Sequence, residues 1–385
     1  MISIVDKQNC CGCEACTQRC PKSCIRMQKD TEGFLYPTID TTSCIDCGLC
    51  EKVCPVLNQN KAKEPLAVYA AKNKNETIRT ESSSGGIFTL LATEIIQENG
   101  AVFGAKFNEK WEVVHDYTYS EEGLAQFRGS KYVQSKIGQS YQQVLHLLNE
   151  DKKVLFSGTP CQIAGLKLFL QKDYENLVTV DFICHGVPSP EVWKVYLEDI
   201  LHNCQNSPDN INFRDKRLGW KKYSFSISFR HTKTEKHIFT QNIYENLYLQ
   251  GFLANLYLRP SCHRCPSKSF KSNSDITIAD FWGIDRILPN WDDDRGVSMV
   301  MLNSPRGEEI FKNINITHQE CEYNRIIPLN PSLIYSAPAH IYRVDFFKDL
   351  NMHKYKISSL VLKYCYTPRE RIKRSIKRCV KIFNN

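Results

Sequence analysis

The chain has 385 residues, of which 24% are charged, and its formal net charge is +8. This length allows two or three domains. Residues 363–381 carry eight Lys or Arg side chains against one Glu, which accounts for nearly all of the positive excess. Because the rest of the chain is close to neutral, its composition excludes a general nucleic-acid-binding protein.

The cysteine content and the start of the chain indicate a compartment. The sequence contains 18 cysteines. Residues 1–9 lack the basic start and the apolar run of a signal peptide, and no apolar stretch reaches the length of a membrane span. Many cysteines without a secretion signal are typical of a reducing compartment and of metal chemistry. We therefore expect a cytoplasmic protein.

A repeated cysteine pattern dominates the first 55 residues. Both halves read C-x2-C-x2-C-x3-C-P, one with Cys10, Cys13, Cys16 and Cys20 and the other with Cys44, Cys47, Cys50 and Cys54. In two-cluster bacterial ferredoxins, three cysteines of each half bind one 4Fe-4S cluster and the fourth crosses to the other. We assign one cluster to Cys10, Cys13, Cys16 and Cys54, and the other to Cys44, Cys47, Cys50 and Cys20. Residues 1–57 thus resemble such a ferredoxin.

Zinc is the alternative for this region, since zinc ribbons also use C-x2-C pairs. The third cysteine of each half disfavours zinc, and the reducing compartment disfavours disulfides. Two further cysteines lie outside the repeat. The spacing to Cys13 favours Cys10 over Cys11 as the ligand, and we expect Cys24 to be a buried thiol.

After a short polar linker at 58–64, the apolar periodicity predicts alternating strands and helices. Strands are expected at 66–71, 101–107, 111–119, 153–157, 177–183, 223–230, 275–280 and 297–302, and helices at 87–98, 137–149, from about 162, and 188–201. A hairpin joins the second and third strands, and strand 223–230 should be exposed on one face. The order of elements from 153 to 201 predicts a parallel α/β core. The fold class is therefore α/β (α+β overall), a small N-terminal two-cluster ferredoxin domain followed by a mixed or parallel-sheet α/β domain.

Four cysteines beyond the ferredoxin region could form a third site. Cys161 and Cys184 each come directly after a predicted parallel strand, and Cys262 and Cys265 form a C-x2-C pair. If the two strands are neighbours, both sulfurs point into one crevice at the carboxyl ends of the sheet. The four thiols would then suit a third 4Fe-4S cluster. The alternative is two ordinary buried thiols and a separate minor site.

Two glycine-containing loops suggest a phosphate-bearing cofactor. The run Ser82–Gly86 reads SSSGG and directly precedes the helix predicted at 87–98. Free backbone N–H groups at such a helix start suit a phosphate or pyrophosphate. Residues 128–132, RGSKY, add two cations and an aromatic ring, which is consistent with a nucleotide. A flexible capped loop and an exposed surface loop are the respective alternatives.

The block from about 82 to 283 resembles the family of beta subunits of coenzyme F(420) hydrogenases and dehydrogenases, which includes a hydroxymethyl-chlorophyll reductase. The motifs that carry this resemblance are SSSGG, RGSKYV, GTPCQ, DFICHG, RPSCHRC and DITIADFWG. The resemblance implies FAD beside an iron–sulfur cluster, and it would place FAD at Ser83, Ser84, Gly85, Gly86, Arg128, Ser130, Lys131, Tyr132, Gly158, Thr159 and Gln162. The domains expected are 1–57 (ferredoxin), 65–305 (FAD and iron–sulfur) and 306–385 (C-terminal extension).

The expected function follows from electron counting. Iron–sulfur clusters move single electrons, a deazaflavin or nicotinamide moves a hydride, and a flavin exchanges with both. We therefore expect an oxidoreductase between a redox partner protein or soluble electron carrier and a small-molecule hydride donor or acceptor. His185 is the candidate catalytic acid or base, and Asp181, Asp280 and Asp285 are possible helpers, with structural roles as the alternative. A non-catalytic subunit that relays electrons to a partner enzyme is the alternative function, and a zinc-stapled interaction protein is the third.

The basic tail allows a separate hypothesis. On a helix from Arg369 to Phe383, Ile372, Ile376 and Val380 share one face among basic residues. Such a helix can bind an anionic membrane surface, so peripheral contact with the inner membrane face is one expectation. Packing of the same face on its own domain is the other.

Overall fold

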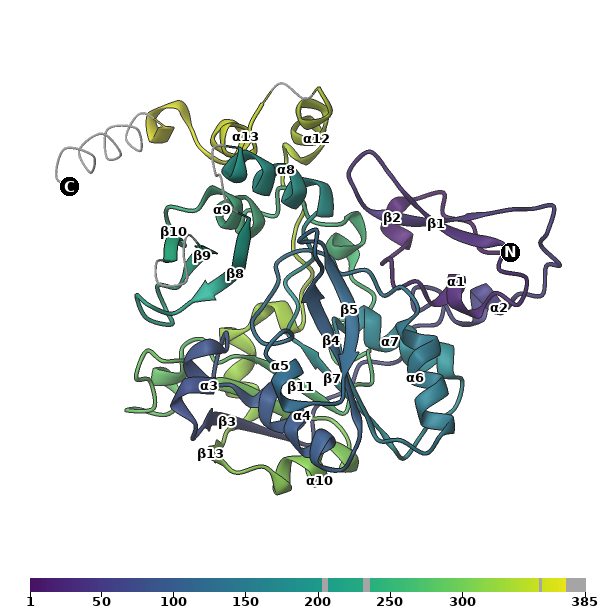
Figure 1. The fold of residues 1–385 in the computed structure, drawn as a ribbon, viewed down its shortest axis with the longest axis horizontal. Helices are drawn as coiled ribbons and strands as arrows, with labels where there is room; N and C mark the ends of the chain where they lie inside the picture. The colour runs from purple at the N-terminus through teal and green to yellow at the C-terminus, as the bar shows by residue number, and fades with distance from the viewer. Residues whose placement is uncertain (203–206, 231–235, 353–354, 372–385) are drawn as a thin grey trace.

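The computed structural model describes residues 1–202, 207–230, 236–352 and 355–371. The first 57 residues form a lobe at one end of the molecule (Figure 1), with helices α1 (Ala15–Arg19) and α2 (Leu49–Lys52) and an antiparallel hairpin of β1 (Ile25–Lys29) and β2 (Leu35–Ile39). Ala15 and Val53 of this lobe share one hydrophobic cluster with Tyr141 and Leu166 of the main body. The lobe is therefore packed onto the main body.

An eight-stranded mixed sheet forms the centre of the molecule, in the order β13-β3-β12-β11-β7-β6-β4-β5. Its middle strands are parallel: β4 (Ala101–Phe107), β6 (Val154–Ser157), β7 (Leu177–Phe182) and β11 (Ile276–Asp280). The antiparallel strands are β5 (Val113–Thr118), β12 (Ser298–Leu302), β3 (Ala67–Asn73) and β13 (Ile316–Glu320). The predicted parallel α/β core and the hairpin of β4 and β5 are confirmed.

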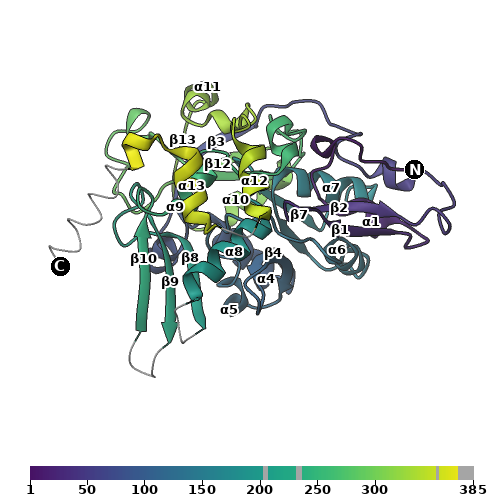
Figure 2. The same cartoon turned by 90° about the horizontal axis from the view of Figure 1, so that it is seen from above.

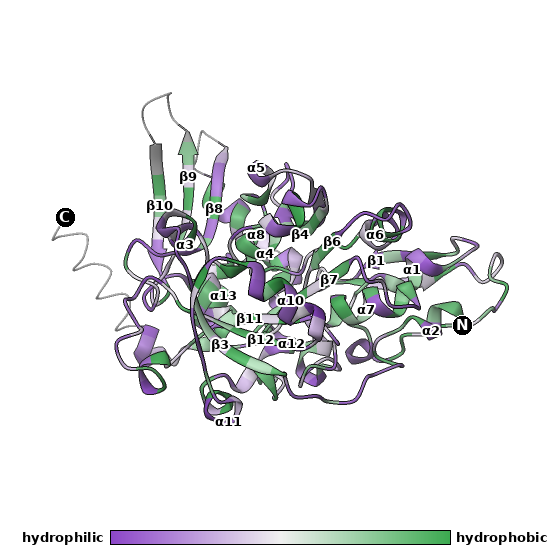
Figure 3. Ribbon diagram, turned by 90° about the horizontal axis from the view of Figure 1, so that it is seen from below, coloured by the Kyte–Doolittle hydropathy of each residue, from purple (hydrophilic) through white to green (hydrophobic). Residues whose placement is uncertain are grey.

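Helices cover both faces of this sheet, and successive residues of each strand point to opposite faces. Val102 of β4 packs in a cluster with Leu91 of α4 (Ile87–Gln97) and Phe311 of α10 (Pro305–Asn313). The next residue, Phe103, packs in the cluster of α6 (Ser140–Asn149) and α7 (Pro160–Leu170). Both sheet faces are therefore buried, and Figure 3 shows β3 and β12 as mainly hydrophobic. The short helices α3 (Glu76–Glu81) and α5 (Glu121–Leu124) flank the α4 side.

A second sheet lies at the opposite end from the ferredoxin lobe (Figure 2). It contains β8 (Pro208–Asp215), β9 (Ser224–Arg230) and β10 (Lys236–Asn242), all antiparallel. An aromatic cluster with Trp193 and Tyr248 joins it to helices α8 (Pro190–Leu201), α9 (Leu247–Leu253), α12 (Arg343–Asn351) and α13 (Ile357–Cys365). The expectation that β9, the central strand, is exposed on one face is wrong: Ser224 and Ser226 are buried, as is Phe225 between them.

The remaining elements are short, namely α11 (Tyr323–Ile326) and the 3-10 turns η1 (Lys7–Asn9), η2 (Pro260–Arg264), η3 (Ile284–Arg286), η4 (Ile327–Leu329) and η5 (Pro331–Leu333). The polar linker at 58–64 is anchored, since Lys63 N donates to Ser269 O at 3.1 Å. Within the described residues no helix is both long and apolar enough to cross a bilayer. The basic helix predicted from Arg369 onward lies outside the described residues from position 372 to its end.

Candidate functional site

A cavity of about 560 Å³ lies where the parallel strands β4, β6, β7 and β11 end. This volume is in the range of cofactor pockets, and the carboxyl ends of parallel strands are where ligands bind in open α/β sheets. The lining includes the 82–89 segment, the 127–133 segment and the loops that follow the strands, and it is completed by residues of the second sheet, of 252–253 and of 329–332. The fold therefore brings both predicted glycine-containing loops to one cavity.

One end of the cavity is suited to phosphate. Helix α4 starts after Gly86, which has φ +82°, and no side chain caps its first turn. Its free N–H groups and its dipole therefore favour an anion at the cavity wall. Lys131 lies nearby and donates to the carbonyls of Gln126 (2.8 Å) and Arg128 (3.1 Å), and burial lowers the pKa of Lys131 to about 7. A bound phosphate would accept hydrogen bonds from the free N–H groups of α4 and would stabilise the charged form of Lys131.

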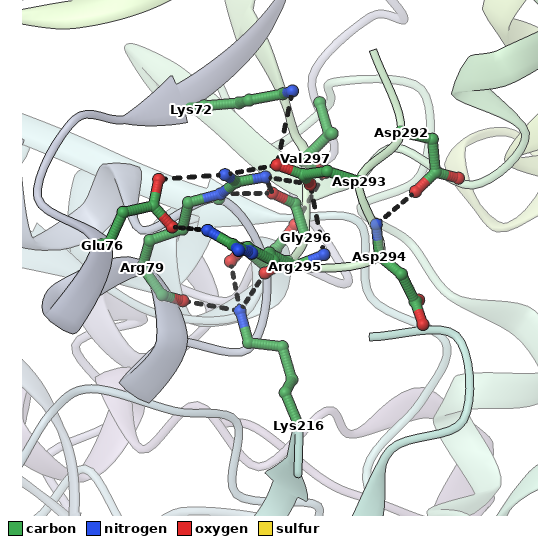
Figure 4. A network of polar contacts seen from close by, with 12 residues as sticks. Lys72, Glu76, Arg79, Lys216, Asp292, Asp293, Asp294, Arg295, Gly296 and Val297 are labelled. Carbon is green, nitrogen blue, oxygen red and sulfur yellow. Dashed lines mark hydrogen bonds and ion pairs between the residues drawn. The ribbon is translucent and has the colours of Figure 1, made fainter. Parts of the chain in front are cut away.

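A polar network fixes the loop at this end (Figure 4). Lys216 Nζ donates to three carbonyl oxygens, those of Arg79 (2.6 Å), Ser84 (2.9 Å) and Arg295 (2.6 Å). Arg79 in turn holds the carboxylate of Asp293, at 2.5 Å and 2.8 Å from its two Nη atoms. The pKa of Lys216 is lowered to about 7, first by burial and then by nearby Arg79. The network ties the 82–86 loop to the 292–297 segment and thereby presets the loop geometry.

Another wall of the cavity is aromatic and charged, and it adjoins the 82–86 loop, since Arg214 Nη2 donates to the Ser83 carbonyl at 3.2 Å. Arg214 forms a two-pronged ion pair with Asp280, at 2.8 and 3.0 Å, and its guanidinium lies over the Tyr223 ring at 4.0 Å. Trp282 lines the cavity beside Arg214 and stacks on Trp220 with ring centroids 4.6 Å apart. Flat aromatic faces beside a guanidinium suit a ring system with polar edges. No sequence motif pointed to Arg214 or Tyr223, which reach the cavity only through the second sheet.

The predicted cofactor residues line this cavity with one exception. Those present in the lining are Ser83, Ser84, Gly86, Arg128, Ser130, Lys131, Tyr132, Gly158, Thr159 and Gln162. Gly85 does not line the cavity but packs against β3 and β12. A Cβ at this position would meet the Ala71 oxygen at 2.5 Å, and the Gly85 N–H donates to Ser298 Oγ at 2.9 Å. Thr159 and Gln162 form a capping box, so the Gln162 side chain shapes the turn between β6 and α7.

The predicted acid or base, His185, also lines the cavity. Its Nε2 lies 2.6 Å from Asn255 Oδ1, an acceptor, so Nε2 carries the proton. Burial lowers the pKa of His185, so the ring is neutral at pH 7. Asp181 lines the cavity but is buried and accepts hydrogen bonds from Ser272 and Thr277, which indicates a structural role. Asp285 is not among the lining residues.

Sequence reasoning missed His115 on β5. It lines the cavity, is 8% exposed, and its Nε2 lies 3.0 Å from the Ser157 carbonyl. Burial lowers the pKa of His115 to about 4, so it is neutral. Its Nδ1 has no hydrogen-bond partner among the described residues. A lone histidine on a predicted strand carries no signal that distinguishes such a position.

The four cysteines of the predicted third site come together. Strands β6 and β7 are neighbours, with Ser157 opposite Val180, so Cys161 and Cys184 follow adjacent strand ends. Cys262, Cys161 and Cys265 are all electrostatic neighbours of Cys184, whose pKa is raised well above its usual range by burial first and then by Cys262. Cys184 lines the cavity, whereas Cys161 does not. Four half-buried thiols that suppress each other's ionisation are suited to binding a cationic metal centre.

The ferredoxin cysteines also fall into two groups. Cys20, Cys44, Cys47 and Cys50 line one small cavity, together with Cys24. Cys24 is buried as expected, and its sulfur lies 3.3 Å from that of Cys20. In the other group, Cys10 and Cys54 are neighbours of Cys16, and Cys16 and Cys54 are neighbours of Cys13. Cys54 thus lies near Cys13 and Cys16, and Cys20 lies near Cys44, Cys47 and Cys50, while the ligand assignment itself stays a prediction. No three ligand side chains in the described ranges are arranged for a single metal ion.

Cys11 joins the ferredoxin lobe to the third cysteine group. Its thiol contacts the thiols of both Cys13 and Cys161. Helix α7 approaches the lobe closely at this point, because a Cβ on Gly165 would meet Cys13 Sγ at 3.0 Å. The sequence did not predict this contact. The three cysteine groups and the cavity therefore follow one another in space.

Two protein families match this chain, one in each of its main parts. Residues 151–326 match the family described as the C-terminal part of the coenzyme F420 hydrogenase/dehydrogenase beta subunits, and residues 9–58 match the "4Fe-4S dicluster domain". The chain is 22% identical over 223 residues to an F(420)H(2) dehydrogenase subunit of Methanosarcina mazei, and the match covers 52% of this chain and 63% of that protein. It thus spans less than two thirds of that relative's length.

Two further similarities concern a ferredoxin and a solved structure. Ferredoxin 7Fe of Hydrogenibacillus schlegelii is 34% identical over 79 residues, which cover 19% of this chain and 95% of the ferredoxin. A chain in a structure of the F420-reducing [NiFe] hydrogenase complex from Methanosarcina barkeri is 15% identical, with a TM-score of 0.45, and the match covers 78% of this chain and 92% of that one. The sequence matches support iron–sulfur clusters in this chain.

Proposed function

We propose that the chain is an iron–sulfur flavoprotein oxidoreductase, because residues 151–326 match the coenzyme F420 hydrogenase/dehydrogenase beta-subunit family and residues 9–58 match a 4Fe-4S dicluster domain. It binds three 4Fe-4S clusters and one FAD. It passes electrons between a one-electron partner and a small-molecule hydride donor or acceptor. The observation that carries this proposal is Cys184, which lines the same cavity as the uncapped start of α4 and Lys131.

The donor sets fit the clusters. Each of the three groups supplies four cysteine sulfurs, namely Cys10, Cys13, Cys16 and Cys54; Cys20, Cys44, Cys47 and Cys50; and Cys161, Cys184, Cys262 and Cys265. Thiolate-only ligation is the usual chemistry of 4Fe-4S clusters. In the third group the Val187 N–H points at Cys262 Sγ, 3.4 Å away, and such N–H contacts stabilise a thiolate. The domain division at 57, 65 and 305 remains our proposal.

The cavity residues fit FAD. The N–H groups at the start of α4, together with Lys131 and Arg128, would hold its diphosphate. Arg214, Tyr223 and Trp282 would hold a ring system. A flavin exchanges both hydrides and single electrons, which is the chemistry needed between a hydride carrier and the clusters.

The exposed cluster ligands indicate where a redox partner docks, and the cavity residues indicate which group handles the proton. Cys47 is the exposed member of the second group, so a redox partner protein or carrier is proposed to dock on that side of the lobe. Neutral His185 is proposed to accept or return a proton in the cavity, with Asn255 fixing its tautomer. Two variants check this role. H185Q should slow hydride-dependent reduction of the bound flavin and change its pH profile, whereas N255D should shift that profile by raising the imidazole pKa.

Anaerobic purification with quantification of iron, sulfide and flavin tests the proposal. We expect about 12 irons, an equal amount of sulfide, and one FAD per chain. About 8 irons without flavin would instead support a non-catalytic electron-transfer subunit that serves a partner enzyme. That second function is favoured by one observation, since the relative in Methanosarcina mazei is by name a subunit. Zinc without sulfide would contradict both.

A further inference from the structure

Arg259 connects the third cysteine group to the first. It directly precedes η2, the turn that carries Cys262, and its carbonyl accepts the Cys262 N–H at 2.9 Å. Its side chain extends into the ferredoxin lobe. There Nε donates to the Cys10 carbonyl at 2.8 Å, and Nη2 lies 3.5 Å from the Cys10 sulfur. One residue therefore touches the ligand loops of two proposed clusters.

No acidic side chain among the described residues forms a direct pair with this guanidinium, although the buried Glu14 carboxylate interacts with it electrostatically. Arg259 is 1% exposed, and within the described residues no carboxylate lies at ion-pair distance from it. Its other partners are neutral: the Gln134 side-chain oxygen at 2.9 Å and the Leu35 carbonyl at 2.8 Å, with the Tyr36 ring 4.3 Å away. A buried cation without a directly paired anion is costly, so the surroundings of Arg259 favour a further negatively charged group beside it.

A neighbouring buried arginine shows the usual way in which a buried positive charge is compensated. Arg343 is also buried and also reaches the ferredoxin lobe. It pairs with the carboxylate of Glu32, with Nη1 at 2.9 Å from Oε1, and donates to the Leu258 carbonyl at 3.0 Å. Arg343 is thus paired directly with a carboxylate, whereas Arg259 is not. The groups that Arg259 does face belong to Cys10 and its loop.

We propose that Arg259 is the counterion of the cluster held by Cys10, Cys13, Cys16 and Cys54, and that its charge raises the reduction potential of this cluster. The inference rests on the clusters of the proposed function. Reduction adds one electron to the cluster and makes its charge more negative, so a fixed cation at the Cys10 sulfur favours the reduced state. The electron would then be held at the cluster nearest to Cys161, next to the third cysteine group, whose member Cys184 lines the cavity.

The test is a redox titration of the full chain followed by electron paramagnetic resonance. At a fixed potential, R259Q should lower the reduced-to-oxidised ratio of one cluster at least about tenfold, which corresponds to about 59 mV for one electron. R259K keeps the charge and should stay within about threefold of wild type. R343Q, the matched control, removes a buried positive charge that is paired with Glu32 and contacts no proposed cluster ligand, so it should leave all cluster ratios within about twofold. A C13S variant, which changes a ligand of the same cluster, identifies its signal.

The outcomes separate this inference from the proposed function. Fully loaded R259Q protein whose cluster ratios all match wild type would overturn the counterion role alone. If R259Q does not load its clusters, R259K decides: loading with a near-wild-type ratio supports the role of the charge, and failure to load overturns it. Wild-type protein without the ferredoxin clusters would overturn the proposed function itself, and the iron count of the same sample shows this directly.

Discussion

Replacing Lys131 with Met should weaken FAD binding and remove its pH dependence. Lys131 lines the cavity at the uncapped start of α4, and burial lowers its pKa to about 7. Its described hydrogen bonds go to two carbonyl oxygens, so a bound diphosphate would supply an anionic partner. A phosphate beside the ammonium raises the pKa again, since it favours the charged form.

The expected loss of FAD affinity follows from the removed positive charge, and its pH dependence follows from the linkage between FAD binding and protonation of Lys131. A hydrogen bond to a charged group contributes about 1.5–3 kcal/mol, so at pH 6 K131M should bind FAD about 10- to 100-fold more weakly than wild type. Below pH 7 the free Lys131 is already protonated, and wild-type affinity should be flat. Above pH 7 binding must take up a proton, so affinity should fall by up to about tenfold per pH unit.

The assay is fluorescence titration of flavin-depleted protein with FAD at pH 6, 7, 8 and 9, performed anaerobically so that the clusters remain intact. K153M is the matched control, because Lys153 forms an exposed pair with Glu98 away from the cavity lining. It should behave as wild type. If K131M binds within twofold of wild type and shows the same decline above pH 7, the assignment of the phosphate end is wrong.

Three further predictions concern the site and its support. C184A should contain about 8 irons instead of about 12, with C321A as the unchanged control. R214M should lose about 3 kcal/mol in urea unfolding, because it strands the Asp280 carboxylate, whereas R217M at a more exposed pair should lose less than about 1 kcal/mol. Burial raises the pKa of Asp181 to about 6, so its ionisation should cost stability as pH rises from 4 to 6. Relative to D181N, wild type should lose about 3 kcal/mol over that range; equal slopes would contradict this.

The elements that could be predicted from sequence are those with local signals. The cysteine spacing groups the ferredoxin thiols, and the apolar runs at β6 and β7 place Cys161 and Cys184 after parallel strands. The sequence also led to the cavity loops, because glycines before a helix indicate an open N-terminus. Gly85 was the error in that set: its N–H and its Cβ position face β3 and β12, a packing role that resembles a ligand role in sequence.

The parts that could not be predicted depend on tertiary contacts. Arg214 and Tyr223 come from the second sheet and meet Asp280 only once both sheets pack together. The burial of Ser224 and Ser226 on β9 depends on what packs against that face of the sheet, which the sequence of one strand does not specify. The cysteine spacing disfavours Cys11 as a ligand, yet Cys11 contacts Cys161, 150 residues away in the chain. No local pattern encodes such a contact.

The central claim is that one chain joins three clusters to a flavin, and an anaerobic reductive titration tests it most directly. Each 4Fe-4S cluster takes up one electron and a flavin takes up two, so we predict about five electrons per chain, with bleaching of both chromophores. Uptake of about two electrons without flavin bleaching would contradict the account.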